Sequence, residues 1–289
     1  MTELNENRML SEDRVRALVR ETYGAIARAD SSAAQVGCCG PSTSTAPSCC
    51  GPGPALSSSM LGYSEGELAA LPEGANLGLG CGNPNAIAAL REGETVLDLG
   101  SGAGIDCFLA GKQVGAKGRV IGVDMTPDMI AKARSNAARV SATNVEFRLG
   151  EIEHLPVDAG QVDVILSNCV VNLSPNKKGV FLEAFRVLKA GGRVAISDVV
   201  MLKPLPSELA EEAIALSGCV AGAATVDELK SALEAAGFVN IRVAVKPESR
   251  AFIASWLPGS GAEDYVASAT IEASKPGGAK ACCGPTCCP

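Results

Sequence analysis

The chain has 289 residues, a formal net charge of −7, one Trp and three Tyr. A chain of this length can bury a full core, so we expect one moderate domain with appendages rather than two equal domains. The acidic balance and the few large aromatic side chains exclude the basic stripe and the stacking platforms that nucleic-acid binding uses, and they favour small-molecule partners.

Targeting signals are absent from the pattern. The first residues carry no apolar run with a positive flank, and no stretch approaches about 18 uninterrupted apolar residues. We therefore expect no signal peptide, no membrane partner and a cytoplasmic location.

Sulfur dominates the reactive side chains. The 12 cysteines are unusual for a reducing compartment, where stable disulfides are rare. With one histidine, His154, the usual Cys/His zinc sites are nearly excluded, and that residue is expected to lie in a loop without a chemical task. Soft-ion binding or redox chemistry by thiols is the expectation.

The amino-terminal unit, residues 1–60, combines a helix and a loop. Residues 12–27 have apolar side chains at helical spacing after Ser11, a good N-cap. From about 37 to 59 the chain is rich in Cys, Gly, Pro, Ser and Thr, which predicts a mobile cysteine-rich loop.

The central unit, residues 61–200, alternates strand and helix patterns. Expected strands cover 95–100, 119–124, 144–150, 162–168 and 193–200, and expected helices cover 105–114, 127–139 and 178–189, the last closed by Gly191 and Gly192. This alternation predicts a doubly wound α/β fold with a mostly parallel sheet.

A smaller α+β region, residues 201–258, is expected on the substrate side. It contains a helix near 207–217, a helix at 226–236 opened by the capping box of Thr225 and Glu228, and a strand at 239–245. Residues 259–289 are expected to form a flexible cysteine-rich tail. The sequence CCGP recurs at 38–41, 49–52 and 282–285, followed by CCP at 287–289, all in segments expected to be flexible.

A glycine-rich run, DLGSGAG at 98–104, follows the first expected strand and opens a helix. Such glycines let the backbone approach a nucleotide-like ligand at the carboxyl edge of the sheet. The spacing is not that of the dinucleotide fingerprint, and no P-loop lysine follows. Asp98 would repel a pyrophosphate but suits the ammonium group of a cationic cofactor. Asp124 ends the second strand, where it can accept both ribose hydroxyls, and Met125 can pack on an adenine.

This arrangement resembles the class I S-adenosylmethionine methyltransferases. The resemblance implies a Rossmann-like fold with S-adenosylmethionine as cofactor, and it puts Ile152 and Glu153 beside the adenine and Asn168 beside the cofactor. The complete expected cofactor set is Asp98, Gly100, Ser101, Gly102, Gly104, Asp124, Met125, Ile152, Glu153 and Asn168.

The acceptor side carries a thiol where many relatives of this fold carry other groups. The fourth strand ends in SNCV at 167–170, not in the Asn-Pro-Pro-Tyr type motif of DNA amino-group methyltransferases. No Pro-Cys pair of the cytosine-methylating type occurs in the core, and no His or Tyr is an evident base for a hydroxyl substrate. A nucleophile that needs no deprotonation resolves this absence. As(III) is one, because it binds up to three thiolates and keeps a lone pair that can attack a sulfonium methyl group in line.

Over about residues 10–250 the chain resembles the arsenite methyltransferase family. The motifs that carry the resemblance are Tyr23-Gly24 followed by Cys38, Gly80-Cys81-Gly82, SNCVVNL at 167–173, SGCVAGA at 217–223, DLGSGAGIDC at 98–107 and IEHLP at 152–156.

The resemblance implies the roles of the thiols. Cys169 and Cys219 would hold arsenic beside the methyl donor, with Cys81 as the third thiol and Cys38 as the loop thiol that joins it. Oxidation of Cys38 and Cys81 to a disulfide would return methylated, pentavalent arsenic to the trivalent state. An external reductant, glutathione or thioredoxin, would then reset the enzyme by exchange. The arsenic would arrive as arsenite or as its thiol conjugate.

The remaining cysteines are assigned more loosely. Cys39, Cys49 or Cys50 could replace Cys38. The terminal Cys282, Cys283, Cys287 and Cys288 would form a trap that captures arsenite, or an idle tail. Cys107 is expected to be a small packing residue.

Two other functions remain open from the sequence. One is a methyltransferase of the same fold with a small carbon, nitrogen or oxygen acceptor and protective cysteines. The other is a soft-metal-binding protein on a Rossmann scaffold, although such a scaffold has no need of Asp98 and Asp124.

Overall fold

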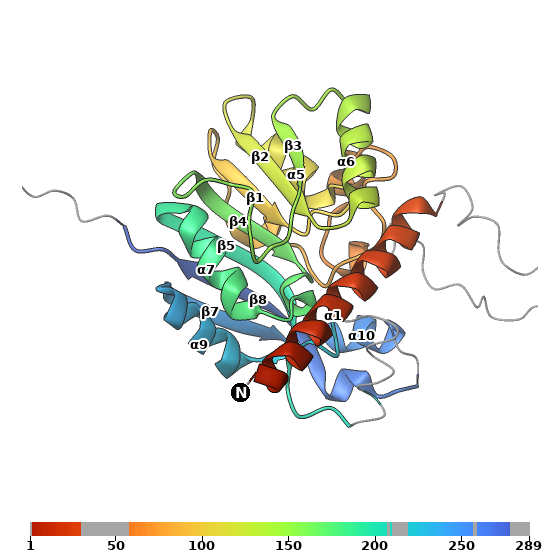
Figure 1. Ribbon diagram of the computed structural model, residues 1–289. Coiled ribbons are helices and arrows are strands. Elements are labelled where there is room, and N and C mark those ends of the chain that lie inside the picture. Colours follow the sequence, from red (N-terminus) through yellow and green to blue (C-terminus); the bar gives the residue numbers. More distant parts are fainter. Residues whose placement is uncertain (1, 30–57, 207–208, 210–218, 257–258, 278–289) are drawn as a thin grey trace, which may run out of the picture.

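The computed structural model describes residues 2–29, 58–206, 209, 219–256 and 259–277 (Figure 1). Eight of the predicted arsenic-capturing or loop thiols therefore lie outside the described residues: Cys38, Cys39, Cys49, Cys50, Cys282, Cys283, Cys287 and Cys288. Most of the helix expected near 207–217 does so too. No helix in the described part of the chain has the length and apolar character that a membrane span requires.

One sheet of eight strands forms the centre of the molecule (Figure 1). Its strands are β1 (Thr95–Leu99), β2 (Arg119–Asp124), β3 (Val145–Leu149), β4 (Val162–Asn168), β5 (Leu188–Met201), β6 (Ala224–Thr225), β7 (Val239–Lys246) and β8 (Val266–Ser274). They follow the order β3-β2-β1-β4-β5-β8-β7, and β6 pairs with β5. The strands expected from the sequence are all present.

The strands β3, β2, β1, β4 and β5 run parallel. Their apolar runs, such as Val162–Asn168, are buried on both faces of the sheet, which is why they read as continuous rather than alternating. The order reverses at β1 and β4, so a crevice opens beyond the carboxyl ends of these strands.

Helices cover both faces of the sheet. One core cluster packs α4 (Asn85–Ala88), α5 (Ile105–Val114) and α6 (Pro127–Arg139) on one face, and a second packs α7 (Lys177–Val187) and α9 (Val226–Ala236) on the other. The doubly wound α/β prediction is confirmed. The capping box of α9 forms as expected, because Thr225 accepts a hydrogen bond from the Glu228 N–H at 3.2 Å.

Helix α1 (Thr2–Arg28) crosses the front of the sheet and packs against α6 and the 3-10 turn η2 (Val171–Leu173) (Figure 1). The remaining short elements are α3 (Glu65–Ala69), η3 (Pro247–Ser249), α10 (Arg250–Trp256) and η4 (Ala262–Asp264).

One expectation about the carboxyl-terminal part was wrong. Residues 259–289 are not all a flexible tail, because β8 lies between β5 and β7 and pairs antiparallel with both. Its sequence, VASATIEAS, has small side chains that give a weak strand pattern, yet almost every residue is buried. The α+β region 201–258 is therefore not separate from the core, since β7 extends the same sheet.

The end of α7 also differs from the expectation. The helix ends at Val187 rather than near 189, and Leu188 already has an extended backbone. Gly191 and Gly192 lie inside the long strand β5 and not at the helix end.

Candidate functional site

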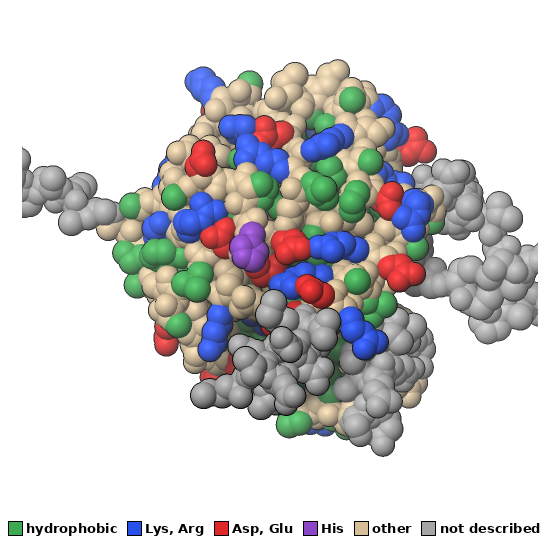
Figure 2. All heavy atoms as spheres, in the orientation of Figure 1, with side chains coloured by type: hydrophobic (Ala, Val, Ile, Leu, Met, Phe, Trp, Pro, Cys, Tyr) green, Lys and Arg blue, Asp and Glu red, His purple; other side chains and the backbone are tan. Residues whose placement is uncertain are grey.

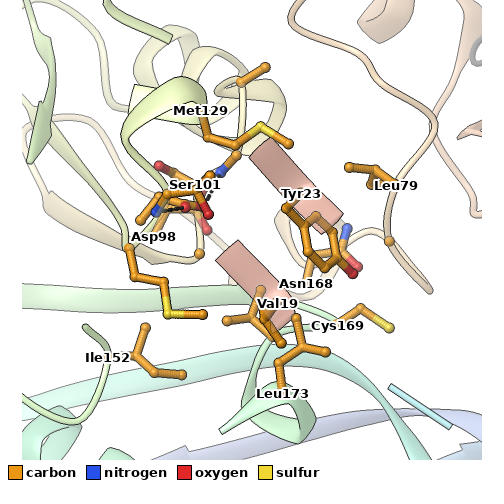
Figure 3. Close-up of a pocket in the computed structure, with 18 of the residues that line it drawn as sticks. Val19, Tyr23, Leu79, Asp98, Ser101, Met129, Ile152, Asn168, Cys169 and Leu173 are labelled. Carbon is orange, nitrogen blue, oxygen red and sulfur yellow. Dashed lines mark hydrogen bonds between the residues drawn. The ribbon is translucent and has the colours of Figure 1, made fainter. Parts of the chain in front are cut away.

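A cavity of about 120 Å³, open to solvent, lies at the carboxyl edge of the sheet (Figure 3). Nine of the ten residues expected to bind the cofactor line it: Asp98, Gly100, Ser101, Gly102, Asp124, Met125, Ile152, Glu153 and Asn168. They come from β1, β2, β4 and the loops that follow strands. The sheet topology thus gathers a set that is scattered over 71 positions of sequence, from 98 to 168.

The tenth residue, Gly104, does not line the cavity. It caps α5 with φ 101°, and a Cβ there would lie 2.8 Å from Phe108 and Phe147. This glycine lets the helix pack closely on the strand behind the loop, and its contact with the cofactor stays a prediction.

The glycine loop gives the cavity a backbone floor. Gly100 has φ 68°, and a Cβ on it would lie 2.3 Å from Val170. The Gly102 N–H donates to the Asp124 carboxylate at 3.0 Å, which fixes that side chain. The buried Ser101 hydroxyl has no hydrogen-bond partner among the described residues. A ligand in the cavity would therefore meet the fixed carboxylate of Asp124 and the free hydroxyl of Ser101.

Two buried carboxylates add negative charge to this cavity. Asp106, which sequence analysis missed, accepts hydrogen bonds from Tyr63 at 2.8 Å and from Asn85 at 2.7 Å. Burial raises the pKa of Asp98 and raises that of Asp106 to about 6, and their mutual repulsion adds to the shift of Asp98. The signal for Asp106 was its place in the first turn of the helix after the glycine loop. A cationic ligand here would relieve the repulsion.

Helix α1 closes one side of the cavity. Val19 and Tyr23 point into it from α1 (Figure 3). Arg16 forms an ion pair with the buried Glu153 at 3.5 Å, and Glu153 also accepts a hydrogen bond from Ser174 at 2.6 Å. The carboxylate of Glu153 is thus held by Arg16 of α1 and by Ser174, and only part of the residue faces the cavity. Sequence analysis gave no role to Arg16 or Val19.

A second cavity adjoins the first and is lined by two of the three thiols. Cys169 and Tyr23 line both cavities, and Cys219 lines the second. The Cys169 thiol interacts with the thiols of both Cys81 and Cys219, so the three side chains lie together with Cys169 in the middle. The three described cysteines that the sequence singled out for arsenic therefore meet at one place.

Backbone contacts fix these thiols. Cys169 has φ 59°, uncommon for a residue with a side chain, and its N–H donates to the Ser197 carbonyl at 2.8 Å. The Cys219 thiol donates to the Cys169 carbonyl at 3.1 Å. Asn168 holds the GCG loop, because it accepts a hydrogen bond from the Cys81 N–H at 2.9 Å and donates to the Gly82 carbonyl at 2.8 Å.

The thiols are kept in the protonated form. Burial raises the pKa of Cys81 to about 11 and raises that of Cys169. For Cys219 the hydrogen bond with Cys169 is the first cause of its raised pKa and burial the second, while the Tyr23 hydroxyl opposes both by donating to its sulfur. A soft electrophile that replaces these protons would convert an unfavourable set of buried thiols into ligands.

Cys107 and His154 lie where the sequence predicts them. Cys107 is fully buried in the core, as expected, and also donates a hydrogen bond to Asp98 at 3.2 Å. His154 lies exposed in a loop, as expected. Around that loop, basic and acidic side chains are interspersed rather than gathered in a stripe (Figure 2).

A methyltransferase-domain family model matches residues 90–237. An arsenite methyltransferase of Halobacterium salinarum is 52% identical to the chain, over 94% of this chain and 70% of that protein. The chain belongs to the arsenite methyltransferase family. The human arsenite methyltransferase is 39% identical over 51% of this chain and 42% of that protein, so the chain spans well under half of that relative.

A solved structure agrees with this membership. The arsenic(III) S-adenosylmethionine methyltransferase of Chlamydomonas reinhardtii superposes with a TM-score of 0.55 at 30% identity, over 78% of this chain and 74% of that one. The class I methyltransferase fold and the dependence on S-adenosylmethionine expected from the glycine loop are confirmed by these relatives.

Proposed function

We propose that this arsenite methyltransferase relative transfers methyl groups from S-adenosylmethionine to As(III) held by Cys169, Cys219 and Cys81. One observation carries the proposal: Cys169 lines both cavities, so a thiol-bound atom would lie beside the cofactor. The result would be methylated arsenicals and detoxification of arsenite.

The first cavity fits a cationic nucleoside cofactor. The free Ser101 hydroxyl, the side-chain-free approach at Gly100 and the carboxylates of Asp98 and Asp106 all suit a polar, positively charged ligand. Asp124 would accept the ribose hydroxyls, while Met125 and Ile152 would enclose the adenine. When bound, S-adenosylmethionine supplies an electrophilic methyl group on a sulfonium centre.

The protein's share of the reaction is to position arsenic. Each thiol that binds As(III) gives its proton to a hydroxyl group that leaves arsenic as water, so binding needs no external base. The central position of Cys169 keeps arsenic within reach of both neighbouring thiols. Catalysis then depends mainly on orientation of the arsenic lone pair towards the methyl group.

Turnover requires a reductant. We infer that Cys81 and a thiol of the loop, Cys38 or one of Cys39, Cys49 and Cys50, give two electrons to pentavalent arsenic and form a disulfide. Glutathione or a thioredoxin-type protein would reduce that disulfide by exchange, which suits a reducing compartment such as the cytoplasm. The terminal cysteines would capture arsenite or its thiol conjugates.

Two rival functions are less well supported. A carbon, nitrogen or oxygen acceptor would have to use Lys177 or Tyr23 as its base in the second cavity, and it would leave Cys169 and Cys219 without a role. A soft-metal store has no use for a glycine loop with fixed carboxylates. Failure to bind S-adenosylmethionine would revive the second rival.

The experiment is methylation by the purified, reduced protein with S-adenosylmethionine, arsenite and a thiol reductant. Arsenic species are separated by chromatography with elemental detection. We expect methylarsenic products from the wild type and a loss of at least about 100-fold for Cys169→Ser, because an alcohol does not hold As(III) as a thiolate does.

Cys107→Ser is the matched control, because that cysteine does not line the second cavity and the serine hydroxyl can still donate a hydrogen bond to Asp98. It should keep most of the activity. Cofactor binding by the wild type without any methylated arsenic would instead favour a carbon, nitrogen or oxygen acceptor.

A further inference from the structure

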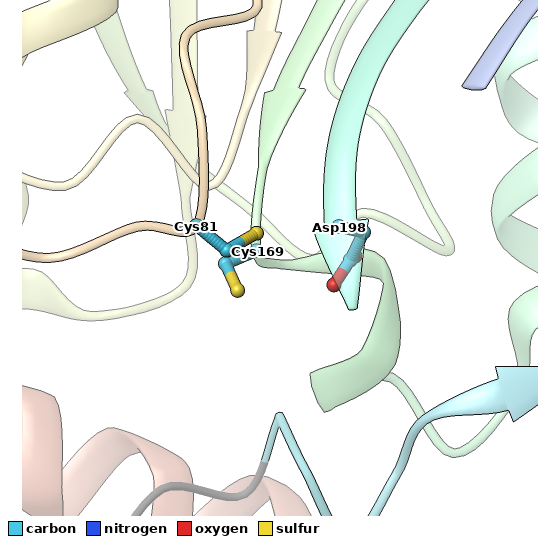
Figure 4. Close-up of side chains that lie close together, drawn as sticks. All are labelled: Cys81, Cys169 and Asp198. Carbon is cyan, nitrogen blue, oxygen red and sulfur yellow. The ribbon is translucent and has the colours of Figure 1, made fainter. Parts of the chain in front are cut away.

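A buried carboxylate that the proposed function leaves without a role lies beside the thiols. Asp198 is 1% exposed and follows Ser197, which pairs with Asn168 at the end of β4. One oxygen of Asp198 and the sulfurs of Cys81 and Cys169 lie within 4.8 Å of one another (Figure 4). In Figure 4 the carboxylate reaches from β5 towards the same space as the two sulfurs.

The carboxylate is fixed by donors on the protein. Its Oδ1 accepts hydrogen bonds from the Asn172 side chain at 2.8 Å and from the Val199 N–H at 2.8 Å, and its Oδ2 accepts one from the Asn172 N–H at 3.3 Å. These donors favour the ionised form and prevent rotation of the side chain. Oδ1 thus uses both of its acceptor sites, whereas Oδ2 keeps one, since a carboxylate can accept about four hydrogen bonds in total.

Burial works against that charge. It raises the pKa of Asp198 to about 6, although the backbone N–H groups of Val199, Asn172 and Val171 and the neighbouring Lys177 oppose the shift. The carboxylate has no basic side chain in hydrogen-bond contact among the described residues, and only neutral N–H donors support its charge. A buried negative charge of this kind is costly unless a positive charge appears near it during function.

Such a charge appears in methyl transfer to arsenic. The arsenic lone pair forms the As–C bond, the S–C bond of the methyl donor breaks, and its electron pair stays on sulfur. The positive charge thus moves from the sulfonium to the arsenic, which changes from neutral As(III) to cationic methylated As(V). No proton, oxidant or other reactant is needed for this step.

We propose that the Asp198 carboxylate stabilises the positive charge that develops on thiol-bound arsenic as it accepts the methyl group. The inference rests on the proposed function, because it requires arsenic on Cys81 and Cys169. A preorganised charge in a water-poor site acts on the transition state more than on the ground state, since arsenic is neutral before transfer. Removal of the charge should therefore lower the rate of transfer and leave arsenite affinity nearly unchanged.

The first test is Asp198→Asn, which keeps the size of the side chain and removes its charge. In single-turnover methylation we expect a decrease of about 100-fold, the usual range for loss of one electrostatic contact to a transition state. Binding of arsenite, followed by elemental analysis after gel filtration, and binding of S-adenosylhomocysteine, followed by calorimetry, should change less than about 3-fold. A loss of arsenite affinity with an unchanged transfer rate would overturn the proposal and make Asp198 an arsenic ligand.

A second readout does not depend on turnover. Tetramethylarsonium carries the charge of the product without reacting, so its affinity for the wild type with S-adenosylhomocysteine bound should exceed that for Asp198→Asn by about 10-fold. Equal affinities would contradict the proposal. This binding result stands even if the wild type does not methylate arsenite, and that second failure would concern the proposed function alone.

A second variant, with the opposite expected effect on the rate, tests the proposal even if Asp198→Asn misfolds. Lys177 lines the second cavity and interacts electrostatically with both Asp198 and Cys219. Lys177→Met removes a positive charge from the same environment but also favours the neutral form of Asp198, so the comparison is made at about pH 8.5, where that carboxyl stays ionised. Single-turnover transfer should then be faster, by about 3-fold, and tetramethylarsonium should bind more tightly. An unchanged or slower transfer would count against a role for local charge.

Discussion

At the residue scale, burial sets the pKa of the thiols and keeps them protonated, so they are not activated as nucleophiles. Many nucleophilic cysteines have a lowered pKa, whereas burial raises the pKa of Cys81 to about 11 although the nearby Lys246 opposes the shift. Reactivity towards alkylating agents is therefore suppressed, while affinity for a soft atom that replaces the proton is retained. This combination suits capture of As(III) in a cell full of other electrophiles.

The raised pKa of Cys81 predicts a distinctive pH profile. Because the pKa is above the usual value, the thiol form persists to higher pH in the native protein. Iodoacetamide labelling of native Cys81 should rise about tenfold per unit between pH 8 and 10, whereas labelling of the unfolded chain should level off above about pH 9. Peptide mapping by mass spectrometry measures both rates. A native profile that levels off at the same pH as the unfolded one would contradict the assigned shift.

At the element scale, helix α1 joins the two cavities. Tyr23 lines both of them, and its hydroxyl donates to Cys219, while Arg16 anchors the same helix to the buried Glu153. Arg28 adds a surface ion pair with Asp128 at the end of the helix. An amphipathic pattern predicted the helix, but its partners are far away in the sequence.

The anchor at Arg16 can be tested through the cofactor. Arg16→Ala leaves Glu153 with one fewer partner and loosens α1, so affinity for S-adenosylmethionine should fall about 10-fold in calorimetry. Arg20→Ala is the matched control, since Arg20 lies on the same helix as Arg16 and pairs with Glu151, which is more exposed than Glu153. Its effect should stay below about 2-fold, as is usual for surface ion pairs. Equal effects of the two substitutions would argue against a specific anchor at Arg16.

At the scale of the whole molecule, β8 makes the carboxyl-terminal segment part of the core. It pairs with β5 along nine residues and separates β5 from β7. Lys275, directly after β8, donates to the carbonyls of Phe185 and Leu188 at 2.7 and 2.8 Å. The segment after 259 therefore contains both structural residues and the terminal cysteines.

Two truncations separate these parts. Deletion of residues 266–289 removes β8 and should abolish cooperative thermal unfolding, because β5 and β7 lose their common neighbour. Deletion of 278–289 removes only the CCGPTCCP segment and nearby residues, and it should change the unfolding temperature by less than about 2 °C. Circular dichroism measures both. Cooperative unfolding of the chain that lacks residues 266–289 would contradict the role of β8.

The sequence by itself determined the local features of this protein. Apolar runs with glycine turns predicted β1 to β5, and helical spacing with caps predicted α1, α5, α6 and α9, because these signals arise within a few neighbouring residues. The glycine loop with Asp98 and Asp124 and the cysteines of the family motifs gave most of the site. Within the loop, the conformation of Gly104 serves packing.

Only the tertiary structure decided which groups act together. The pairing of β8 depends on partners more than 60 residues earlier and on burial of small side chains that carry little pattern of their own. Asp106 and Asp198 gain their properties from desolvation, and Arg16 from a buried partner 137 positions away. The burial and the electrostatic environment of each group depend on several segments that the sheet brings together, so no local sequence pattern can predict them.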